Sequence, residues 1–235
     1  MAVGRLGTVE KALRVLTAIS EQQPVTVTRL ARALDMDKSG VQRTVVTLHD
    51  AGWLRQDPAT SAWSLDAQAL VVGRRFAGGL FDRARPHLEA LASATGETVT
   101  LWVVRGPSFV VVDSVESSQP LRIVIPVGLE APLTTGPGVA AFLDEEARGH
   151  LGDAVPPEDE LAEVRARGYY VTTGGAAGTI AMGAPVYAPG PGPGASAVGT
   201  LLVTAPVSRA GVAELEAMAP RLLAAAGAVS AGSAG

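Results

Sequence analysis

Hydrophobic residues recur at helical spacing three times within the first 50 positions of the chain. Apolar side chains three or four positions apart line one face of a helix, so each recurrence predicts a helix with one buried face. The residues expected to be buried are Val9, Leu13, Leu16 and Ile19 in the first helix, Leu30, Ala31 and Leu34 in the second, and Val41, Val45 and Leu48 in the third. Candidate N-caps are Thr8 and Thr26 for the first two helices and Asp37 or Ser39 for the third, which Gly52 is expected to end.

Two segments of alternating polar and apolar residues follow the third helix. Residues 53–56 and 62–65 have the pattern of strands, and the Asp-Pro-Ala-Thr sequence at 57–60 is typical of a turn between them. Two helices joined by a tight turn and followed by such a hairpin make a winged helix-turn-helix, in which the second helix of the pair reads DNA.

The outward face of that second helix carries groups that can contact DNA. Arg43 can bond guanine and Gln42 can bond adenine in the major groove. Lys38 and the first-turn N–H groups suit a phosphate, and Arg55 on the wing is a candidate backbone contact. The full expected DNA-binding set is Thr26, Lys38, Ser39, Gly40, Gln42, Arg43 and Arg55. The alternative is an ordinary helical pair with a solvated polar face.

The remainder of the chain mixes both periodicities. A linker helix over 67–80, broken near Gly78 and Gly79, separates a domain at 1–66 from a second at 81–229, with 230–235 as a tail. The second domain is expected to contain helices at 81–94, 138–151, 161–166 and 208–226, and strands at 98–104, 109–115, 121–127, 169–171, 180–186 and 197–203. The Pro-Gly repeat at 189–194 should form an exposed hairpin tip, and residues 227–235 should fray. The fold class is therefore α+β.

Charge separates the two domains. The net charge is −4 over 235 residues, but residues 1–75 hold ten Lys/Arg against seven Asp/Glu, and the rest hold nine against sixteen. A mildly basic N-terminal domain followed by an acidic C-terminal domain is typical of a protein whose first domain binds DNA and whose second domain does not. The charged N-terminus does not resemble a signal peptide and no apolar run approaches a membrane span, so a cytoplasmic protein is expected.

Catalytic signatures are weak. His49, His87 and His150 lack metal-ligand spacing, and the chain has no cysteine, nucleophile elbow or P-loop. Residues 136–141 match the loose pattern Gly-x-Gly-x-x-Ala, but no βαβ unit surrounds them and Pro137 removes an N–H that a dinucleotide turn needs. No catalytic residue, metal or cofactor is expected.

Several motifs occur in an order that is typical of one family. Residues 9–13 (VEKAL), 38–43 (KSGVQR) and 51–54 (AGWL) are followed by 88–91 (LEAL), 95–99 (TGETV), 120–122 (PLR), 132–134 (PLT), 167–169 (RGY) and 184–186 (APV). In this order the chain resembles the IclR family of bacterial transcriptional regulators. The resemblance covers nearly the whole chain, although no single motif is diagnostic.

The resemblance implies a GAF-like antiparallel sheet with a small-molecule pocket on one face. The effector-binding residues that it implies, with weaker candidates added by strand direction, are Leu101, Ile123, Thr134, Thr135, Gly136, Pro137, Thr173, Ile180, Ala181, Leu202 and Thr204. The alternative for each is plain core.

Three departures from the family pattern bear on the ligand. Relatives that sense small carboxylates have an acidic run where this chain has residues 172–175 (TTGG). Ala181 stands where family members frequently have a cysteine, and Leu202 stands where they have one of two strand serines. Fewer polar partners make a charged ligand costly to bury, so a larger and more apolar effector is expected.

A further departure from the family pattern lies in the helix that is expected to read DNA. Gly40 replaces a threonine that is common in the family, which either lets the backbone approach DNA or weakens the helix.

The function expected from these observations is transcriptional regulation. A homodimer or dimer of dimers would bind a pseudo-palindromic operator, and the effector would change operator affinity. A winged-helix protein-interaction module with a vestigial sensor domain remains an alternative, followed by an enzyme that uses the C-terminal cavity. Whether regulation is repression or activation is left open.

Overall fold

The computed structural model describes residues 4, 6–75, 79–173, 175–190 and 195–231. The chain divides into two compact units, Met1–Arg75 and Phe76–Gly235, and each is described by itself.

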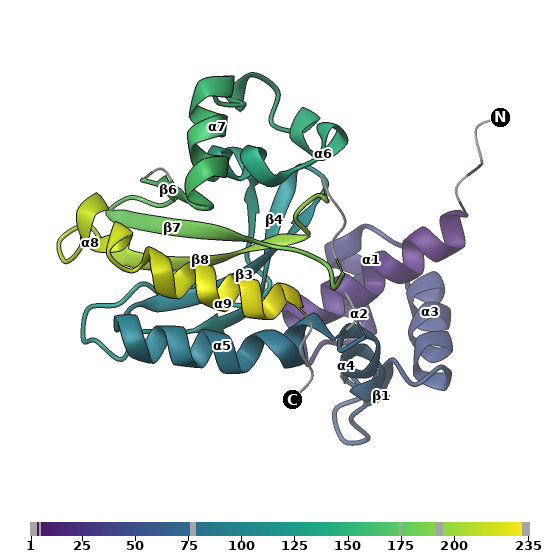
Figure 1. Cartoon of the computed structure of the whole chain (residues 1–235). Helices are drawn as coiled ribbons and strands as arrows, with labels where there is room; N and C mark the ends of the chain where they lie inside the picture. The colour runs from purple at the N-terminus through teal and green to yellow at the C-terminus, as the bar shows by residue number, and fades with distance from the viewer. Residues whose placement is uncertain (1–3, 5, 76–78, 174, 191–194, 232–235) are drawn as a thin grey trace. The chain divides into compact units, whose positions relative to one another are not determined.

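The first unit is a winged helix-turn-helix, as the sequence predicts (Figure 1). Its elements are α1 (Gly7–Gln22), α2 (Val27–Leu34), α3 (Lys38–Asp50), β1 (Leu54–Gln56), β2 (Trp63–Leu65) and α4 (Ala67–Gly73). The strands β1 and β2 pair antiparallel, and Val25 adds an isolated bridge to Trp63. The buried side chains of Val41 and Val45 hold α3 against the other helices, so the opposite face of α3 is exposed.

The predicted packing of α1 is partly wrong. Its buried residues are Val15, Ala18 and Ile19, whereas the side chains of Val9 and Leu13 are 51% and 59% exposed. At about 100° per residue, Val9 and Leu13 lie on a face of the helix next to the one that Val15 and Ile19 occupy. Thr8 lies inside the helix and is not its cap, because α1 begins one position earlier with Leu6 at the N-cap.

The other predicted caps have mixed outcomes. Thr26 stands at the N-cap of α2, but its hydroxyl makes no capping hydrogen bond. Asp37 caps α3 by accepting a hydrogen bond from the Gly40 N–H. Gly52 follows the end of α3 in the left-handed region, at φ +78°, as expected of a residue that ends a helix.

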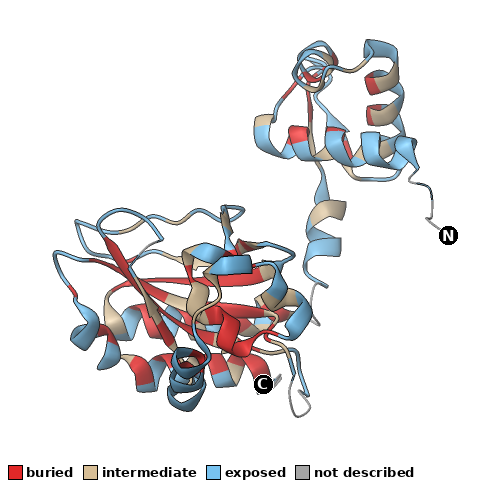
Figure 2. Ribbon diagram, turned by 90° about the horizontal axis from the view of Figure 1, so that it is seen from above, coloured by how far each residue is buried: buried red, intermediate tan, exposed pale blue. Residues whose placement is uncertain are grey.

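The second unit is built on a six-stranded antiparallel sheet with the order β5-β4-β3-β8-β7-β6. Its strands are β3 (Thr98–Arg105), β4 (Ser108–Val115), β5 (Glu130–Pro132), β6 (Tyr170–Thr172), β7 (Thr179–Val186) and β8 (Gly199–Pro206). The central strands β3, β8 and β7 are nearly continuously buried, because other elements cover both faces of the sheet (Figure 2). The predicted α+β class is confirmed.

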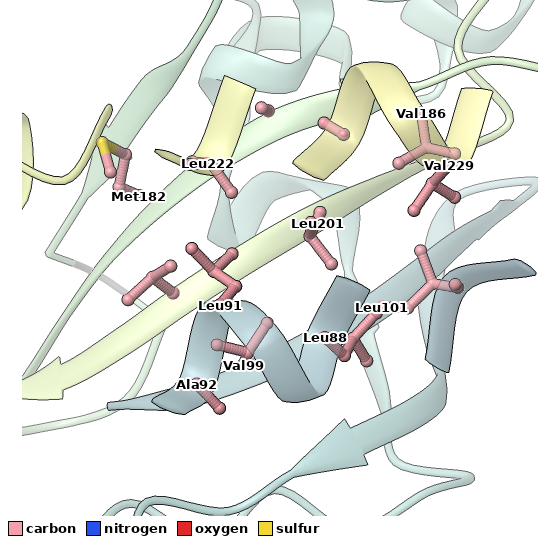
Figure 3. Close-up of a cluster of buried hydrophobic side chains, with 14 of the residues drawn as sticks. Leu88, Leu91, Ala92, Val99, Leu101, Met182, Val186, Leu201, Leu222 and Val229 are labelled. Atoms are coloured by element: carbon pink, nitrogen blue, oxygen red, sulfur yellow. The ribbon is translucent and has the colours of Figure 1, made fainter. Parts of the chain in front are cut away.

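Two helices, α5 (Leu80–Thr95) and α9 (Ala219–Ala231), lie side by side on one face of the sheet (Figure 1). Figure 3 shows Leu88 and Leu91 of α5 and Leu222 of α9 directed toward Leu101 and Leu201 of the sheet. The short helix α8 (Val212–Glu216) contributes Leu215 to the same core.

The opposite face is covered by short helices at one end only. These are η2 (Leu133–Thr135), η3 (Pro137–Phe142), α6 (Glu145–Gly149), η4 (Gly152–Ala154) and α7 (Glu158–Arg167). They form a second core with Trp102, Phe109 and Tyr170. The rest of this face borders the cavity that is described below.

Three predicted segments of the second unit differ from the structure. Residues 121–127 are not a strand, and the edge strand is instead β5. The helix expected at 138–151 is interrupted, because Asp144 caps a new helix by accepting from the Ala147 N–H at 2.8 Å. The helix expected at 208–226 is split into α8 and α9.

The predicted fraying from residue 227 is wrong as far as Ala231, because α9 continues to that residue. Val229 is fully buried, and the Ser230 hydroxyl oxygen accepts a hydrogen bond from the Tyr187 N–H at 3.0 Å. Residues 76–78 of the predicted linker, 191–194 of the predicted hairpin tip and 232–235 of the predicted tail lie outside the described residues.

Candidate functional site

The exposed face of α3 presents Gln42, Arg43 and Val46 to solvent. Gln42 and Arg43 make no side-chain hydrogen bond within the described residues, so both keep their donors for an external partner. Val46 is 41% exposed and is an apolar position on an otherwise polar face.

The start of α3 is less open to phosphate than the sequence predicts. The Asp37 carboxylate accepts from the Ser39 hydroxyl at 2.6 Å and from the Gly40 N–H at 2.8 Å. These hydrogen bonds, the one from Ser39 first, lower the pKa of Asp37 below its usual value. An ionised carboxylate at the N-terminus of α3 satisfies the helix but repels a DNA phosphate there. Lys38 remains exposed beside it.

The wing is held in place by its own turn and by the helical core. The Asp57 carboxylate accepts from the N–H groups of Ala59 and Thr60, at 2.8 and 3.0 Å. These bonds, with Thr60 first, lower the pKa of Asp57. Trp63 of β2 is 3% exposed and packs edge-on against His49 of α3. Arg55 is exposed on β1, so the wing offers it to a partner on a fixed hairpin.

The second unit contains a cavity of about 200 Å³ against the face of the sheet that α5 and α9 do not cover. Its lining is mostly apolar and includes three aromatic side chains. The lining residues are Trp102, Phe109, Ile123, Val124, Ile125, Leu129, Ala131, Thr135, Gly136, Tyr170, Thr172, Gly175, Ala176, Thr179, Ala181, Thr200, Leu202 and Thr204.

The floor of the cavity consists of residues that are paired across neighbouring strands. Ala181 lies opposite Thr204, and Gly183 lies opposite both Tyr170 and Leu202. A Cβ atom on Gly183 would meet the Tyr170 ring carbon Cζ at 2.6 Å, so glycine is required for that ring to lie over β7. The Tyr170 hydroxyl then reaches Thr200 Oγ1 at 3.3 Å, and burial raises the pKa of Tyr170.

One wall of the cavity is residues 116–129, here named the strap. The strap contributes Ile123, Val124, Ile125 and Leu129 to the lining but little strand pairing to the sheet. Its end is joined to β4, where the Gly128 N–H donates to the Val111 carbonyl at 2.8 Å and the Val111 N–H donates to the Leu129 carbonyl at 2.9 Å. Side chains hold the part before it. The Thr98 hydroxyl donates to the Ile123 carbonyl at 2.6 Å, and Arg209 donates to the Leu121 carbonyl at 2.7 Å.

Arg209 is itself fixed by a buried carboxylate. Glu97 is 4% exposed and accepts two hydrogen bonds from the Arg209 guanidinium, both at 2.5 Å. The hydrogen bonds to Glu97 raise the pKa of Arg209. A bidentate Arg–carboxylate pair fixes the planes of both groups, so it positions the donor that reaches the strap.

The predicted effector residues divide into two groups. Six of them line the cavity, namely Ile123, Thr135, Gly136, Ala181, Leu202 and Thr204. Leu101 and Ile180 lie on the other face of the sheet, in the core with α5 and α9, because successive residues of a strand alternate between faces. Thr134, Pro137 and Thr173 do not line this cavity.

Sequence reasoning missed the aromatic wall and Thr200. The alternation that places Leu202 and Thr204 on the cavity face also places Thr200 there, so that residue was accessible from the pattern. Trp102 could have been found only from the pairing of Trp102 with Thr200. Tyr170 depends on the short strand β6 pairing at the far edge of β7, which the sequence does not specify.

The polar side chains of the cavity are satisfied with one exception. Trp102 donates to Thr100 at 2.7 Å, Thr172 to the Thr135 carbonyl at 3.0 Å and Thr200 to the Ala184 carbonyl at 3.0 Å. Thr204 is 4% exposed, and its Oγ1 atom has no hydrogen-bond partner among the described residues. The lining residues that the structure describes include no Asp, Glu, Lys, Arg or His.

Two other kinds of site are not found in the described part of the chain. No group of three or more His, Asp or Glu side chains is placed to hold a metal ion there. No helix among those residues has both the length and the apolar character to cross a membrane.

Comparison with known proteins assigns both units. A family model described as the IclR helix-turn-helix domain matches residues 8–58, and the bacterial transcriptional regulator IclR C-terminal domain matches residues 77–151. The HTH-type transcriptional regulator BhcR of Paracoccus denitrificans is 30% identical over 186 residues, which is 71% of this chain and 66%, just under two thirds, of that protein.

Two solved structures share the fold over nearly the whole chain. An IclR transcriptional regulator from Alicyclobacillus acidocaldarius has a TM-score of 0.76 at 25% identity, covering 97% of this chain and 99% of that one. An IclR homologue from Microbacterium hydrocarbonoxydans, complexed with 4-hydroxybenzoate, has a TM-score of 0.77 at 18% identity, covering 95% and 97%. The chain thus belongs to the IclR family of bacterial transcriptional regulators and joins a helix-turn-helix DNA-binding domain to the C-terminal domain of that family.

Proposed function

We propose that this regulator binds an operator through α3 and the wing, and that a small molecule in the cavity of the second unit controls the affinity. The observation that carries the proposal is the separation of two features in one chain. One unit exposes Gln42 and Arg43 with uncommitted side chains on a capped helix, and the other contains a mostly apolar cavity in which, among the described residues, one hydroxyl has no partner. Such an arrangement lets a ligand act on DNA binding without occupying the DNA-binding face.

The DNA contacts are assigned by the chemistry of each side chain. Arg43 is placed against a guanine and Gln42 against an adenine, while Lys38 and Arg55 contact phosphates. Thr26 and Gly40 lie at the starts of α2 and α3, where they allow close approach to the backbone. The Ser39 hydroxyl donates to Asp37, so its contribution is to the cap that orients α3.

A homodimer or a dimer of dimers in the cytoplasm is proposed as the active form. One winged helix-turn-helix unit offers few base-contacting side chains, and residues 1–75 have an excess of only three basic residues. Two such units on a two-fold operator double both the base contacts and the phosphate contacts. The sign of the regulation depends on where the operator lies relative to the promoter.

The effector is proposed to be rather apolar. No charged side chain among the described residues lines the cavity, and three aromatic rings do. The 4-hydroxybenzoate complex of the M. hydrocarbonoxydans homologue supports a small-molecule role for proteins of this fold.

The test is binding of the full-length protein to the DNA that flanks its own gene, measured by fluorescence polarisation across a salt series. Arg43→Ala is expected to lower specific affinity by about 1–3 kcal/mol, because it removes a base contact. Arg165→Ala on α7 of the other unit removes the same charge and is expected to leave affinity unchanged. Weak binding that is equal for all sequences and all three proteins would overturn the proposal in favour of a protein-interaction module.

A further inference from the structure

We propose that the cavity takes an uncharged compound of one ring that carries a hydrogen-bonding oxygen, and that the Thr204 hydroxyl binds this oxygen. The proposal rests on the proposed function and assigns a chemical class to its effector. It is carried by the size of the cavity, the chemistry of its lining and the position of its one unsatisfied hydroxyl.

The cavity volume sets the size of the ligand. A dry protein cavity of about 150 Å³ is enough to bind benzene. The cavity here is about 200 Å³, so it has room for one ring with a short substituent. It is smaller than the roughly 300–1,000 Å³ that is typical of pockets for drug-sized ligands.

The lining sets the charge. A carboxylate in this cavity would meet threonine, tyrosine and aliphatic groups but no cation among the described lining residues. The Arg209 guanidinium does not act as the cation for such a carboxylate, because it donates its hydrogen bonds to Glu97 and to the Leu121 carbonyl of the strap. A buried charge without a partner is strongly disfavoured, so a neutral ligand is selected.

Thr204 sets the position of the oxygen. Its neighbours across the sheet are Thr98 and Ala181. The Thr98 hydroxyl is committed to the strap, since it donates to the Ile123 carbonyl and accepts from the Ser117 N–H. Ala181 has no polar side-chain group to offer, so the Thr204 hydroxyl is left without a partner among the described residues beside a mostly apolar cavity. Burial of an unpaired hydroxyl is unfavourable, and a ligand oxygen at this point removes the penalty.

The aromatic wall sets the position of the ring. Trp102 and Phe109 pack edge to face with their centroids 6.1 Å apart, and Trp102 lies directly across the strand pair from Thr200. The Trp102 indole N–H donates to Thr100, which lies opposite Leu202, so the indole extends from the level of Thr200 toward Thr204. A single ring can therefore pack against Trp102 and direct a substituent oxygen toward Thr204.

The experiment uses three probes of similar size: toluene, benzyl alcohol and benzoate. Binding to the full-length protein is measured at neutral pH by calorimetry, and the indole N–H signal of Trp102 reports by NMR whether the cavity is occupied. Benzyl alcohol is expected to bind at least tenfold more tightly than benzoate, because only benzoate brings an unpaired charge. It should also bind about fivefold more tightly than toluene, through one hydrogen bond to Thr204.

Two variants isolate the hydroxyl. Thr204→Val keeps the shape of the side chain and is expected to remove the preference for benzyl alcohol over toluene while leaving toluene affinity unchanged. Thr204→Ser keeps the hydroxyl and should keep the preference. The proposal is overturned if benzoate binds as tightly as benzyl alcohol, if Thr204→Val leaves the preference intact, or if no probe shifts the Trp102 signal.

Operator binding, measured separately, distinguishes this proposal from the proposed function. If benzyl alcohol binds through Thr204 but does not change operator affinity, the proposed coupling between cavity and DNA binding is wrong and the ligand class is supported. If benzoate alone changes operator affinity, the coupling is supported and the ligand class is wrong.

Discussion

The two faces of the six-stranded sheet come from alternate residues of the same strands, yet one is a solid core and the other encloses a cavity. On β8, Leu201 points into the core and is fully buried, whereas its neighbour Leu202 lines the cavity. Two long helices, α5 and α9, cover the core face, while short helices at one end and the strap cover the other. Space for a ligand therefore depends on what covers a strand more than on the strand itself.

The two faces also differ in how their covering layers are held. The helices α5 and α9 are held by apolar side chains that interdigitate with the sheet (Figure 3). The strap is held by hydrogen bonds from the side chains of Thr98 and Arg209 to its carbonyl groups, and at its end by backbone hydrogen bonds to Val111 of β4. Packing energy accumulates over many contacts, whereas a few hydrogen bonds position a segment at small net stability. The cavity face is accordingly the part of the unit that can adapt to a ligand.

The largest expected effect comes from truncating neighbouring leucines on opposite faces. Leu201→Ala should destabilise the second unit by about 2–5 kcal/mol, because it opens a void in a close-packed core. Leu202→Ala enlarges a space that already exists and should cost clearly less. The free energy of unfolding is measured by urea unfolding of each variant, and hydrogen exchange of the β8 amides is measured in a separate experiment. Equal losses for the two variants would show that the faces do not differ in packing.

A smaller effect is expected from releasing the strap. Arg209→Gln removes the donors to the Leu121 carbonyl and leaves the buried Glu97 without its partner, which should cost about 1–3 kcal/mol. Amide exchange should accelerate in residues 121–129 and stay unchanged in α5. The double variant Glu97→Gln, Arg209→Gln should recover part of the stability but not the protection of the strap. Uniform acceleration in both regions would contradict a local role for this pair.

Gly183 offers a third way to test the cavity face. Gly183→Ala places a Cβ atom within 2.6 Å of the Tyr170 ring and should destabilise the unit by about 1–3 kcal/mol through overpacking. Gly149→Ala on α6 meets no atom within 4 Å and serves as the matched control. Adding Tyr170→Ala to Gly183→Ala should relieve the overlap, so the double variant should lose less stability than the two single losses added together. Additive losses would show that the ring does not require the glycine.

The sequence predicts local structure in this chain better than it predicts the site. Caps such as Asp37 and Gly52 act within a few residues, so their roles are visible in the pattern. The faces of strands follow from alternation once the face of one residue is known. Thr204 lies on the cavity face of β8, whereas Leu101 lies on the core face of β3, where it pairs with Leu201.

The missed features depend on contacts that are distant in the sequence. The strap has the alternating apolar pattern of a strand, but the carbonyl groups of Leu121 and Ile123 bind the side chains of Arg209 and Thr98, and only Gly128 and Leu129 pair with β4. Tyr170 reaches the cavity because two glycines, Gly138 and Gly183, leave room for its ring. Nothing within either segment alone indicates these arrangements.

The smallest expected effect concerns the Tyr170 hydroxyl on the cavity face. Tyr170→Phe removes the hydrogen bond to Thr200, while Thr200 keeps its bond to the Ala184 carbonyl. The loss at neutral pH should be about 0.5–1.5 kcal/mol. Because wild type carries a buried titratable phenol at this position and the variant does not, the difference in stability between them should depend on pH.

The sign of that dependence follows from the buried phenol. Burial raises the pKa of Tyr170 above its usual value of 10.0, so the unfolded chain releases this proton at lower pH than the folded chain. The stabilisation is complete below pH 10 and falls as the pH rises above it, by about 1 kcal/mol or less at pH 10.5. The urea midpoint of wild type should therefore drop between pH 8 and 10.5 by more than that of Tyr170→Phe. Tyr187, whose pKa is also raised by burial, is present in both proteins, so the difference isolates Tyr170. Parallel curves would mean that the phenol is open to solvent and that the cavity floor is less closed than the packing of Tyr170 over Gly183 implies.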